Sequence, residues 1–298
     1  MCIIAAKYFK GTGWVLAKNR DQDYVSHVSF RDIPDNDVGE ILVMYDHDIS
    51  YQEGMNHNGL AIISTSLTPN LKDETNKKDG DDIFKALHME QKEAANFLIS
   101  QEMTGFIFLA TPEKLIVIEA ARTEDGVYKS RVNVVPKTKT IVRTNHGVNL
   151  LWAGFQYGVT DNQDFWRKSS ESRKRIAQKM VESANSPEEM LDALASRVAD
   201  DLQMNCFRVE NKPRQMRTIF QWALVPSEGI AIIRPIQTKL NLKVSRHKLN
   251  VKIIDNENVK KLYGNRIKHF SEIDLCNNGK EYKTSIKENF LLFRDFIA

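Results

Sequence analysis

The chain has 298 residues, a formal net charge of +3, 42% hydrophobic residues and 27% charged residues. This composition is typical of a globular protein and excludes fibrous and intrinsically disordered classes. Its apolar runs fall far short of the roughly 18 residues of a membrane-spanning helix, and lysines interrupt the N-terminus before a signal peptide can form. We therefore expect neither a membrane segment nor a secretory leader.

The part of the chain from 1 to 235 contains many short β-runs with helices inserted among them. Residues 2–8 and 14–18 flank Lys10-Gly11-Thr12-Gly13, a pattern typical of a β-hairpin. Acidic residues crowd the stretch 73–82, which predicts a solvated loop. Further strands are expected at residues 41–45, 60–66, 106–110, 115–120, 140–144, 219–225 and 230–233.

Helical spacing of apolar residues appears in three places. It predicts helices over 82–100 and 172–182, and a third that begins at Ser186-Pro187-Glu188-Glu189, where Ser186 caps and Glu189 completes a capping box. Strands, then helices, then strands again predict an α+β layered sandwich. No GxGxxG or GxxxxGK[ST] pattern occurs, which excludes the common phosphate-binding loops.

Cys2 is the strongest chemical signal, because removal of Met1 would leave a thiol and a free α-amine on one residue. The ordinary pKa of an α-amine is about 7.7–8.0 and that of a thiol about 8.5, so a proton passes between them at little cost. Such a residue is nucleophile and base together. Cys206 and Cys276 are expected to pack as apolar groups, and three scattered cysteines fit a reducing, cytoplasmic location better than a disulfide scaffold.

Charged residues close the second strand of the hairpin at Lys18-Asn19-Arg20-Asp21. The hairpin places them beside the start of the first strand, where Asp21 can bind the α-amine and a cation can favour the thiolate. The ordinary alternative is a charged strand end in solvent.

Five motifs resemble, in order, the cysteine N-terminal nucleophile (Ntn) hydrolases of the choloylglycine hydrolase, penicillin V acylase and acyl-coenzyme A:isopenicillin N acyltransferase group. They are Met1-Cys2, Asn19-Arg20-Asp21, Asn56-His57-Asn58-Gly59-Leu60, Arg143-Thr144-Asn145-His146 and the helix with Ser172-Arg173. The stretch Asp79-Gly80-Asp81-Asp82-Ile83, ahead of a long helix, is also similar to the family. The resemblance covers roughly residues 2–235 and implies a four-layer αββα sandwich.

The resemblance also implies roles for individual residues. Cys2 would be nucleophile and base, Asp21 would bind the amine, and Arg173 would brace the site. Asn145 would donate its side-chain amide to an oxyanion, which is typically worth about 2.7–4 kcal/mol in acyl transfer. Thr65 or Ser66 occupies the second oxyanion position, and His146 and Arg20 are expected to contact substrate.

Lys18 departs from the family pattern, which has an arginine three residues before the aspartate. Lysine keeps the charge but loses the bidentate fork, so Arg20 is an alternative source of the cation. The implied activity is an amidohydrolase or an N-acyltransferase acting on a small-molecule amide or acyl thioester. The sequence leaves hydrolysis and transfer open.

The implied chemistry needs no cofactor and no metal. His57 and His146 lack the paired spacing of a metal motif. An aromatic stretch follows Asn145, and we expect it either to line the acyl pocket or to belong to the core; its members are Trp152, Phe155, Tyr157, Phe165 and Trp166.

The C-terminal segment, 236–298, differs in charge from the rest of the chain. It holds 13 Lys and Arg against 7 Asp and Glu, a net charge of +6, while residues 1–235 hold 29 against 32, a net charge of −3. We therefore divide the chain into a catalytic domain, 2–235, and a basic, β-containing C-terminal appendage, 236–298, packed on it. Basic and apolar residues alternate along a strand pair that includes Lys239, Lys243, Arg246, Lys248 and Lys252.

Two other functions compete with the enzyme hypothesis. The opening residues and Asn19-Arg20-Asp21 also resemble the NRDE family linked to Golgi organisation and haem handling, which would make the chain a haem carrier. The basic appendage could contact nucleic acid or an anionic substrate, or simply be a solvated face. A homo-oligomer is left open.

Overall fold

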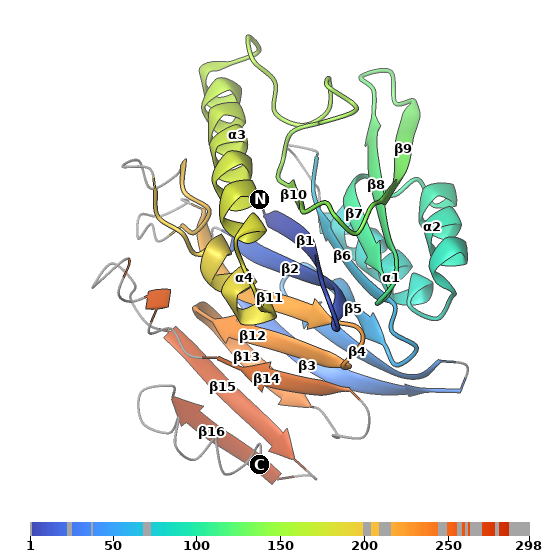
Figure 1. The fold of residues 1–298 in the computed structure, drawn as a ribbon, viewed down its shortest axis with the longest axis vertical. Coiled ribbons are helices and arrows are strands. Elements are labelled where there is room, and N and C mark those ends of the chain that lie inside the picture. Colours follow the sequence, from blue (N-terminus) through green and yellow to red (C-terminus); the bar gives the residue numbers. More distant parts are fainter. Residues whose placement is uncertain are drawn as a thin grey trace.

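The computed structural model describes residues 2–22, 26–36, 38–67, 73–198, 204–208, 216–243, 249–254, 258–259, 262, 270–277 and 280–285. Within these ranges the chain is an α+β protein with two β-sheets and four α-helices (Figure 1). No helix of the described part is long and apolar enough to cross a membrane.

The first sheet has six strands, with the N-terminal hairpin near its middle. In spatial order they are β10 (Ile141–Arg143), β1 (Ile3–Phe9), β2 (Gly13–Gln22), β11 (Arg217–Val225), β12 (Ile230–Pro235) and β14 (Asn250–Ile253). Gly13 has a φ of +85°, and a Cβ there would lie 2.4 Å from the carbonyl oxygen of Pro112, so only glycine fits this turn. Ile3 pairs with Asn19, which sets Cys2 beside the end of β2.

The second sheet has ten strands and takes in both the middle and the end of the chain. In spatial order they are β16 (Lys280–Ser285), β15 (Phe270–Asn277), β13 (Gln237–Lys243), β3 (Ser26–Asp35), β4 (Gly39–Asp46), β5 (Tyr51–Asn56), β6 (Ala61–Thr65), β7 (Gly105–Ala110), β8 (Leu115–Arg122) and β9 (Tyr128–Val135).

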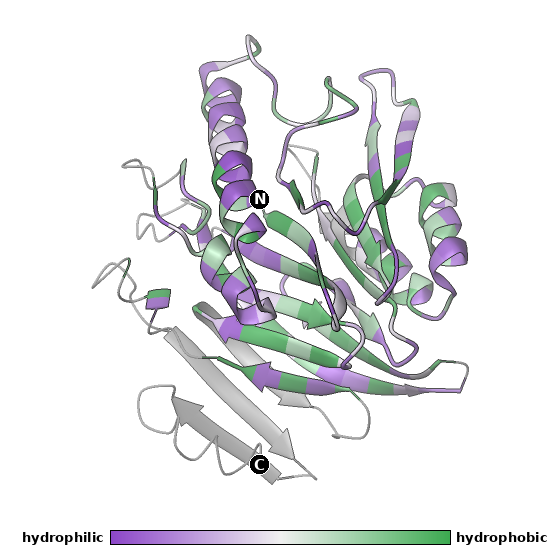
Figure 2. Cartoon of the chain, viewed as in Figure 1, coloured by the Kyte–Doolittle hydropathy of each residue, from purple (hydrophilic) through white to green (hydrophobic). Residues whose placement is uncertain are grey.

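Each sheet carries a pair of helices. Helices α3 (Asp161–Glu182) and α4 (Pro187–Leu194) pack on the six-stranded sheet, and α1 (Asp73–Ala86) and α2 (Gln91–Ser100) pack on the ten-stranded sheet. Hydrophobic residues concentrate on the strands, and α2 and α3 turn mainly hydrophilic residues outward (Figure 2). The strand positions alternate: Ile4 joins the core shared by the two sheets, while Ile3 packs towards α3 and α4.

The expected loop at 73–82 is wrong, because α1 covers this stretch. Asp79 and Asp82 are buried, and Gly80 packs against the backbone of β5 so closely that a Cβ would lie 2.6 Å from the amide nitrogen of Gln52. Burial raises the pKa of Asp79 to about 7. Asp79 and Asp82, at the end of the acidic run, therefore belong to a packed helix rather than to a solvated loop.

The single helix expected over 82–100 is two helices, α1 and α2, with a break at residues 87–90. The side-chain amide of Asn56 donates to the carbonyl oxygen of Leu87 at 2.8 Å and so satisfies a carbonyl left at the end of α1. A contact from a distant strand ends the helix here, and the local pattern contains no sign of it.

Helices α3 and α4 lie where helices were expected, with one shift. α4 begins as predicted, with the Ser186 hydroxyl accepting from the backbone nitrogen of Glu189 at 3.1 Å, although the Glu189 carboxylate accepts from Asn185 rather than from Ser186. α3 begins at Asp161, well before the expected start at residue 172, with Thr160 as its cap.

The C-terminal strands are divided between the two sheets: β14 belongs to the six-stranded sheet, and β13, β15 and β16 belong to the ten-stranded sheet. The predicted strand pair is wrong in its partners, because β13 pairs in parallel with β3 while β14 pairs in parallel with β12 of the other sheet. Lys252 forms an ion pair with Glu188. The basic side chains of Lys239, Lys243, Arg246 and Lys248 lie outside the described side chains, and the division of the chain at residue 235 stays a prediction.

Candidate active site

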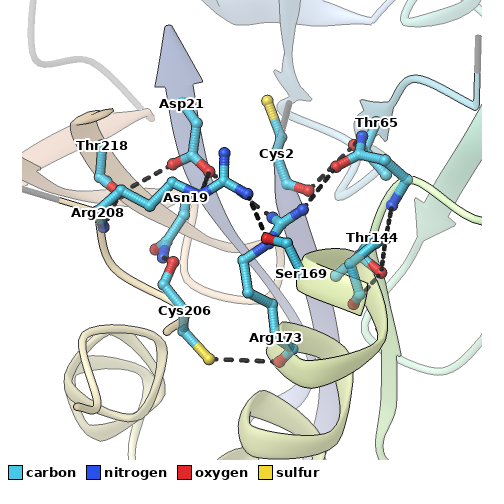
Figure 3. A network of polar contacts seen from close by, with 12 residues as sticks. Cys2, Asn19, Asp21, Thr65, Thr144, Ser169, Arg173, Cys206, Arg208 and Thr218 are labelled. Atoms are coloured by element: carbon cyan, nitrogen blue, oxygen red, sulfur yellow. Dashed lines mark hydrogen bonds and ion pairs between the residues drawn. The ribbon is translucent and has the colours of Figure 1, made fainter. Parts of the chain in front are cut away.

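Cys2 lies at the start of β1 and is buried, with 8% of its surface exposed. Its carbonyl oxygen accepts a hydrogen bond from the Thr65 hydroxyl at the end of β6, at 3.4 Å. Asp21 and Arg208 stand on one side of Cys2 and Thr65 on the other (Figure 3). The nucleophile candidate thus occupies a point where both sheets contribute polar groups.

Asn145 connects Thr65 to α3. Its side-chain nitrogen donates to Thr65 Oγ1 at 3.2 Å and to the Ser66 carbonyl oxygen at 2.8 Å. Its side-chain oxygen accepts from Arg173 Nη2 at 3.1 Å. Four of the residues expected at the site, Cys2, Thr65, Asn145 and Arg173, are therefore joined by consecutive hydrogen bonds, although they come from four separate parts of the chain.

Ser170 of α3 fixes the backbone that carries Asn145. Its hydroxyl accepts from the backbone nitrogen of Asn145 at 2.9 Å and lies 2.8 Å from His146 Nδ1. Thr144 Oγ1 donates to the Ser170 carbonyl oxygen at 3.0 Å. His146 was expected to contact substrate. In the structure it is buried within this network of hydrogen bonds.

The imidazole of His146 is held neutral. Burial, followed by the nearby cations Arg167 and Lys174, lowers its pKa to about 4 from an ordinary value of 6.5. As the pH falls from about 6.5 towards 4, the unfolded chain gains a proton that the folded chain does not, so the folded state loses stability.

We expect the substitution His146→Asn to remove this part of the pH dependence, because an amide oxygen can accept from Ser170 but does not titrate. Urea unfolding at pH 7 and at pH 4.5 measures it. The stability advantage of the original protein over the variant should be larger at pH 7 than at pH 4.5. Parallel pH profiles for the two proteins would contradict the assignment.

Asp21 lies at the end of β2, opposite Thr218 of β11. Its Oδ1 accepts from Thr218 Oγ1 at 2.8 Å. Its Oδ2 lies 3.7 Å from Arg173 Nη1 and 3.7 Å from Arg208 Nε, and the side chains of all three charged residues are fully buried. Asp21 thus ties the hairpin to α3 and to the segment before β11.

Burial lowers the pKa of both arginines that approach Asp21. Burial lowers the pKa of Arg173, while Asp21, Cys206 and Cys2 oppose that shift. Burial and the neighbouring Arg173 together lower the pKa of Arg208 to about 9, against the opposing effects of Asp21 and Cys2. Cys2 is therefore within electrostatic reach of both guanidiniums.

Lys18 and Arg20, the two cations expected beside Cys2, are each engaged by a carboxylate of the ten-stranded sheet. The Lys18 ammonium binds Glu53 of β5, and Arg20 Nε donates to Asp46 of β4 at 3.0 Å. Residues 18 and 20 share one face of β2, while Asn19 and Asp21 share the other. The strand alternation thus separates the predicted cations from the predicted aspartate.

A buried carboxylate holds the loop that follows Asn145. Glu119 of β8 is fully buried, and its oxygens accept from the backbone nitrogens of Val148 (2.7 Å), Asn149 (2.8 Å) and Leu150 (2.9 Å). These three N–H groups surround the carboxylate as they would a bound anion. The loop between β10 and α3 therefore has a fixed base.

Beyond that base the same loop exposes apolar side chains: Leu151, Trp152, Tyr157 and Val159. Of the expected aromatic stretch, Phe155 and Trp166 stack with ring centroids 6.3 Å apart. The stretch thus divides between an exposed part and a packed part.

Sequence reasoning missed Arg208, Ser170 and Glu53. Arg208 is a lone charge in the apolar run Cys206-Phe207-Arg208-Val209, which was the available signal for a buried guanidinium. Ser170 and Glu53 gave no signal. No group of three or more His, Cys, Asp or Glu side chains among the described residues is placed to hold a metal ion.

Comparison with known proteins gives a distant likeness. No family model and no curated protein matches the chain. Its structure is similar to the crystal structure of the C2A mutant of a conjugated bile acid hydrolase from Clostridium perfringens, with a TM-score of 0.46 and 13% sequence identity over 79% of this chain and 89% of that chain. A likeness of this degree assigns no role to any residue.

Proposed function

We propose that the chain is a cysteine Ntn amidohydrolase or acyltransferase in which Cys2, freed by removal of Met1, forms a thioester with the acyl group of a small-molecule amide or thioester. The hydrogen-bonded series Cys2–Thr65–Asn145–Arg173 carries the proposal, because it joins the predicted nucleophile to the predicted oxyanion donor. Helix pairs on the two sheets and an apolar core between the sheets support the expected four-layer αββα sandwich.

The reaction begins when the Cys2 sulfur attacks the acyl carbon and the thiol proton moves to the α-amine. The new oxyanion takes the Asn145 N–H that otherwise faces Thr65 Oγ1, while Arg173 keeps the amide oriented through its oxygen. Collapse breaks the bond to the leaving group, which departs with the proton from the α-amine. Water or an amine then attacks the thioester carbon and gives up a proton to the α-amine. The S–C bond breaks, and the α-amine passes that proton to the sulfur.

The experiment that tests this function uses 4-nitrophenyl acetate as the probe. We expect the purified full-length protein to lack Met1 and to gain one acetyl group, located on Cys2 by intact mass and peptide mapping. Retention of Met1 in protein that still acetylates at Cys2 would contradict the α-amine as base. Absence of acetylation together with a haem absorbance spectrum on mixing would support the carrier hypothesis instead.

We expect Asn145→Ala to lower the rate of 4-nitrophenolate release by about 10²–10³-fold, the usual effect of losing one oxyanion donor. Asn185→Ala is the matched control, since Asn185 lies in the exposed turn between α3 and α4. Stopped-flow absorbance gives both rates. Equal rates in the two variants would remove Asn145 from the reaction.

A further inference from the structure

Two buried guanidiniums share one carboxylate beside Cys2. Arg173 Nη1 and Arg208 Nε both approach Asp21 Oδ2 to 3.7 Å. Within the described part of the chain, Nε and Nη1 of both arginines have no hydrogen-bond partner. A buried cation that lacks a countercharge is strongly destabilising. Among the residues that the structure describes, the cluster therefore holds one more positive charge than its carboxylate balances.

The two cations of β2, Lys18 and Arg20, do not add to this surplus of positive charge. Lys18 is matched by Glu53, and Arg20 is matched by Asp46, each as a buried ion pair. The surplus charge thus belongs to the pair of arginines on the α3 side of the six-stranded sheet.

Arg208 is held in place by contacts that do not involve Cys2. Its Nη2 donates to Ser169 Oγ at 3.0 Å, and its backbone nitrogen donates to Thr218 Oγ1 at 3.0 Å. Its guanidinium lies 5.2 Å from the centroid of the Trp166 ring. Thr218 also binds Asp21, so one hydroxyl connects the carboxylate to the segment that carries Arg208. The guanidinium is therefore fixed beside Asp21 (Figure 3).

We propose that Arg208 is a positioning residue of the Cys2 site: with Arg173 it orients Asp21 and supplies the positive charge that stabilises the Cys2 thiolate. The proposal rests on the proposed function, since the charge matters only if Cys2 is a nucleophile. A cation near a cysteine increases its thiolate fraction and hence its reactivity. Arg208 then performs the task that the sequence assigned to Lys18 or Arg20.

The test is the rate at which iodoacetamide labels Cys2 at pH 7, followed by peptide mapping. Loss of one positive charge near the sulfur should slow labelling about tenfold or more in Arg208→Met. Arg208→Lys should recover most of the rate, because it restores the charge. Arg208→Gln, which is neutral but polar, replaces the methionine variant if that protein does not fold.

The matched control is Arg234→Met. Arg234, in β12, is also a buried arginine, but its guanidinium donates to Gln221 and to Asp192. Iodoacetamide should label Cys2 in Arg234→Met at the same rate as in the original protein. Unchanged labelling in folded Arg208→Met and Arg208→Gln would overturn the role of Arg208 while leaving the nucleophile intact. Failure of Cys2 to label in the original protein would instead overturn the proposed function.

Discussion

Replacement of Cys2 by alanine is expected to abolish both acetylation by 4-nitrophenyl acetate and fast labelling by iodoacetamide at pH 7. Cys2 is the cysteine joined to Thr65 and placed within electrostatic reach of Arg173 and Arg208. The alanine side chain carries no sulfur, so no thioester can form. Intact mass after incubation with each reagent measures the effect.

Cys206 provides the matched control for that result. It is fully buried beneath α3, its Sγ donates to the Arg173 carbonyl oxygen at 3.3 Å, and burial raises its pKa to about 12. A thiol in this setting stays protonated and unreactive at neutral pH. Cys206→Ala should therefore label as the original protein does, and equal loss of labelling in the two variants would exclude Cys2 as the special thiol. The predicted packing of Cys276 lies outside the described side chains.

Lys18→Met is expected to lower the free energy of unfolding by about 3–5 kcal/mol, the usual result of removing one partner of a buried ion pair. The lost ammonium would leave the fully buried carboxylate of Glu53 without its cation. Glu53 also accepts from the backbone nitrogen of Ser64 at 2.9 Å and from the Tyr51 hydroxyl at 3.3 Å, and these two donors cannot neutralise its charge. Chemical denaturation at pH 7 measures the change.

Two companion variants test whether the lost stability comes from the unpaired buried charge. Lys18→Met combined with Glu53→Met removes both charges and should recover much of the lost stability. Lys252→Met removes an exposed ion pair with Glu188 and should change the free energy of unfolding by about 1 kcal/mol or less. If Lys18→Met is as mild as Lys252→Met, the Lys18–Glu53 pair does not hold the two sheets together.

Local sequence patterns predicted the elements whose signals are themselves local. The glycine turn of the first hairpin and the Ser186 cap of α4 need only their own neighbours in the chain. α1 could not be predicted in this way. Its acidic residues resemble a solvated loop, and only the packing of Gly80 on β5, an earlier and separate part of the chain, shows that the helix is buried.

The residues of the candidate site also differ in whether local sequence patterns could identify them. Cys2, Asp21, Asn145 and Arg173 could be selected because they lie in recognisable motifs, and the structure brings them together. Arg208 could not, because its importance comes from its contact with Asp21, which lies far earlier in the chain. Lys18 was placed at the site by its motif, yet its ion pair with Glu53 depends on how the second sheet stacks on the first.

The internal carboxylate of Glu119 divides the loop after Asn145 into a part fixed to the ten-stranded sheet and an exposed apolar part. Because Glu119 and Ser170 pin the two sides of the Asn145 segment, the amide position does not depend on the apolar tip at Leu151, Trp152, Tyr157 and Val159. Substitutions at the tip can accumulate at little cost to the framework beneath it. The exposed part of the loop can therefore vary in sequence while the position of Asn145 stays fixed.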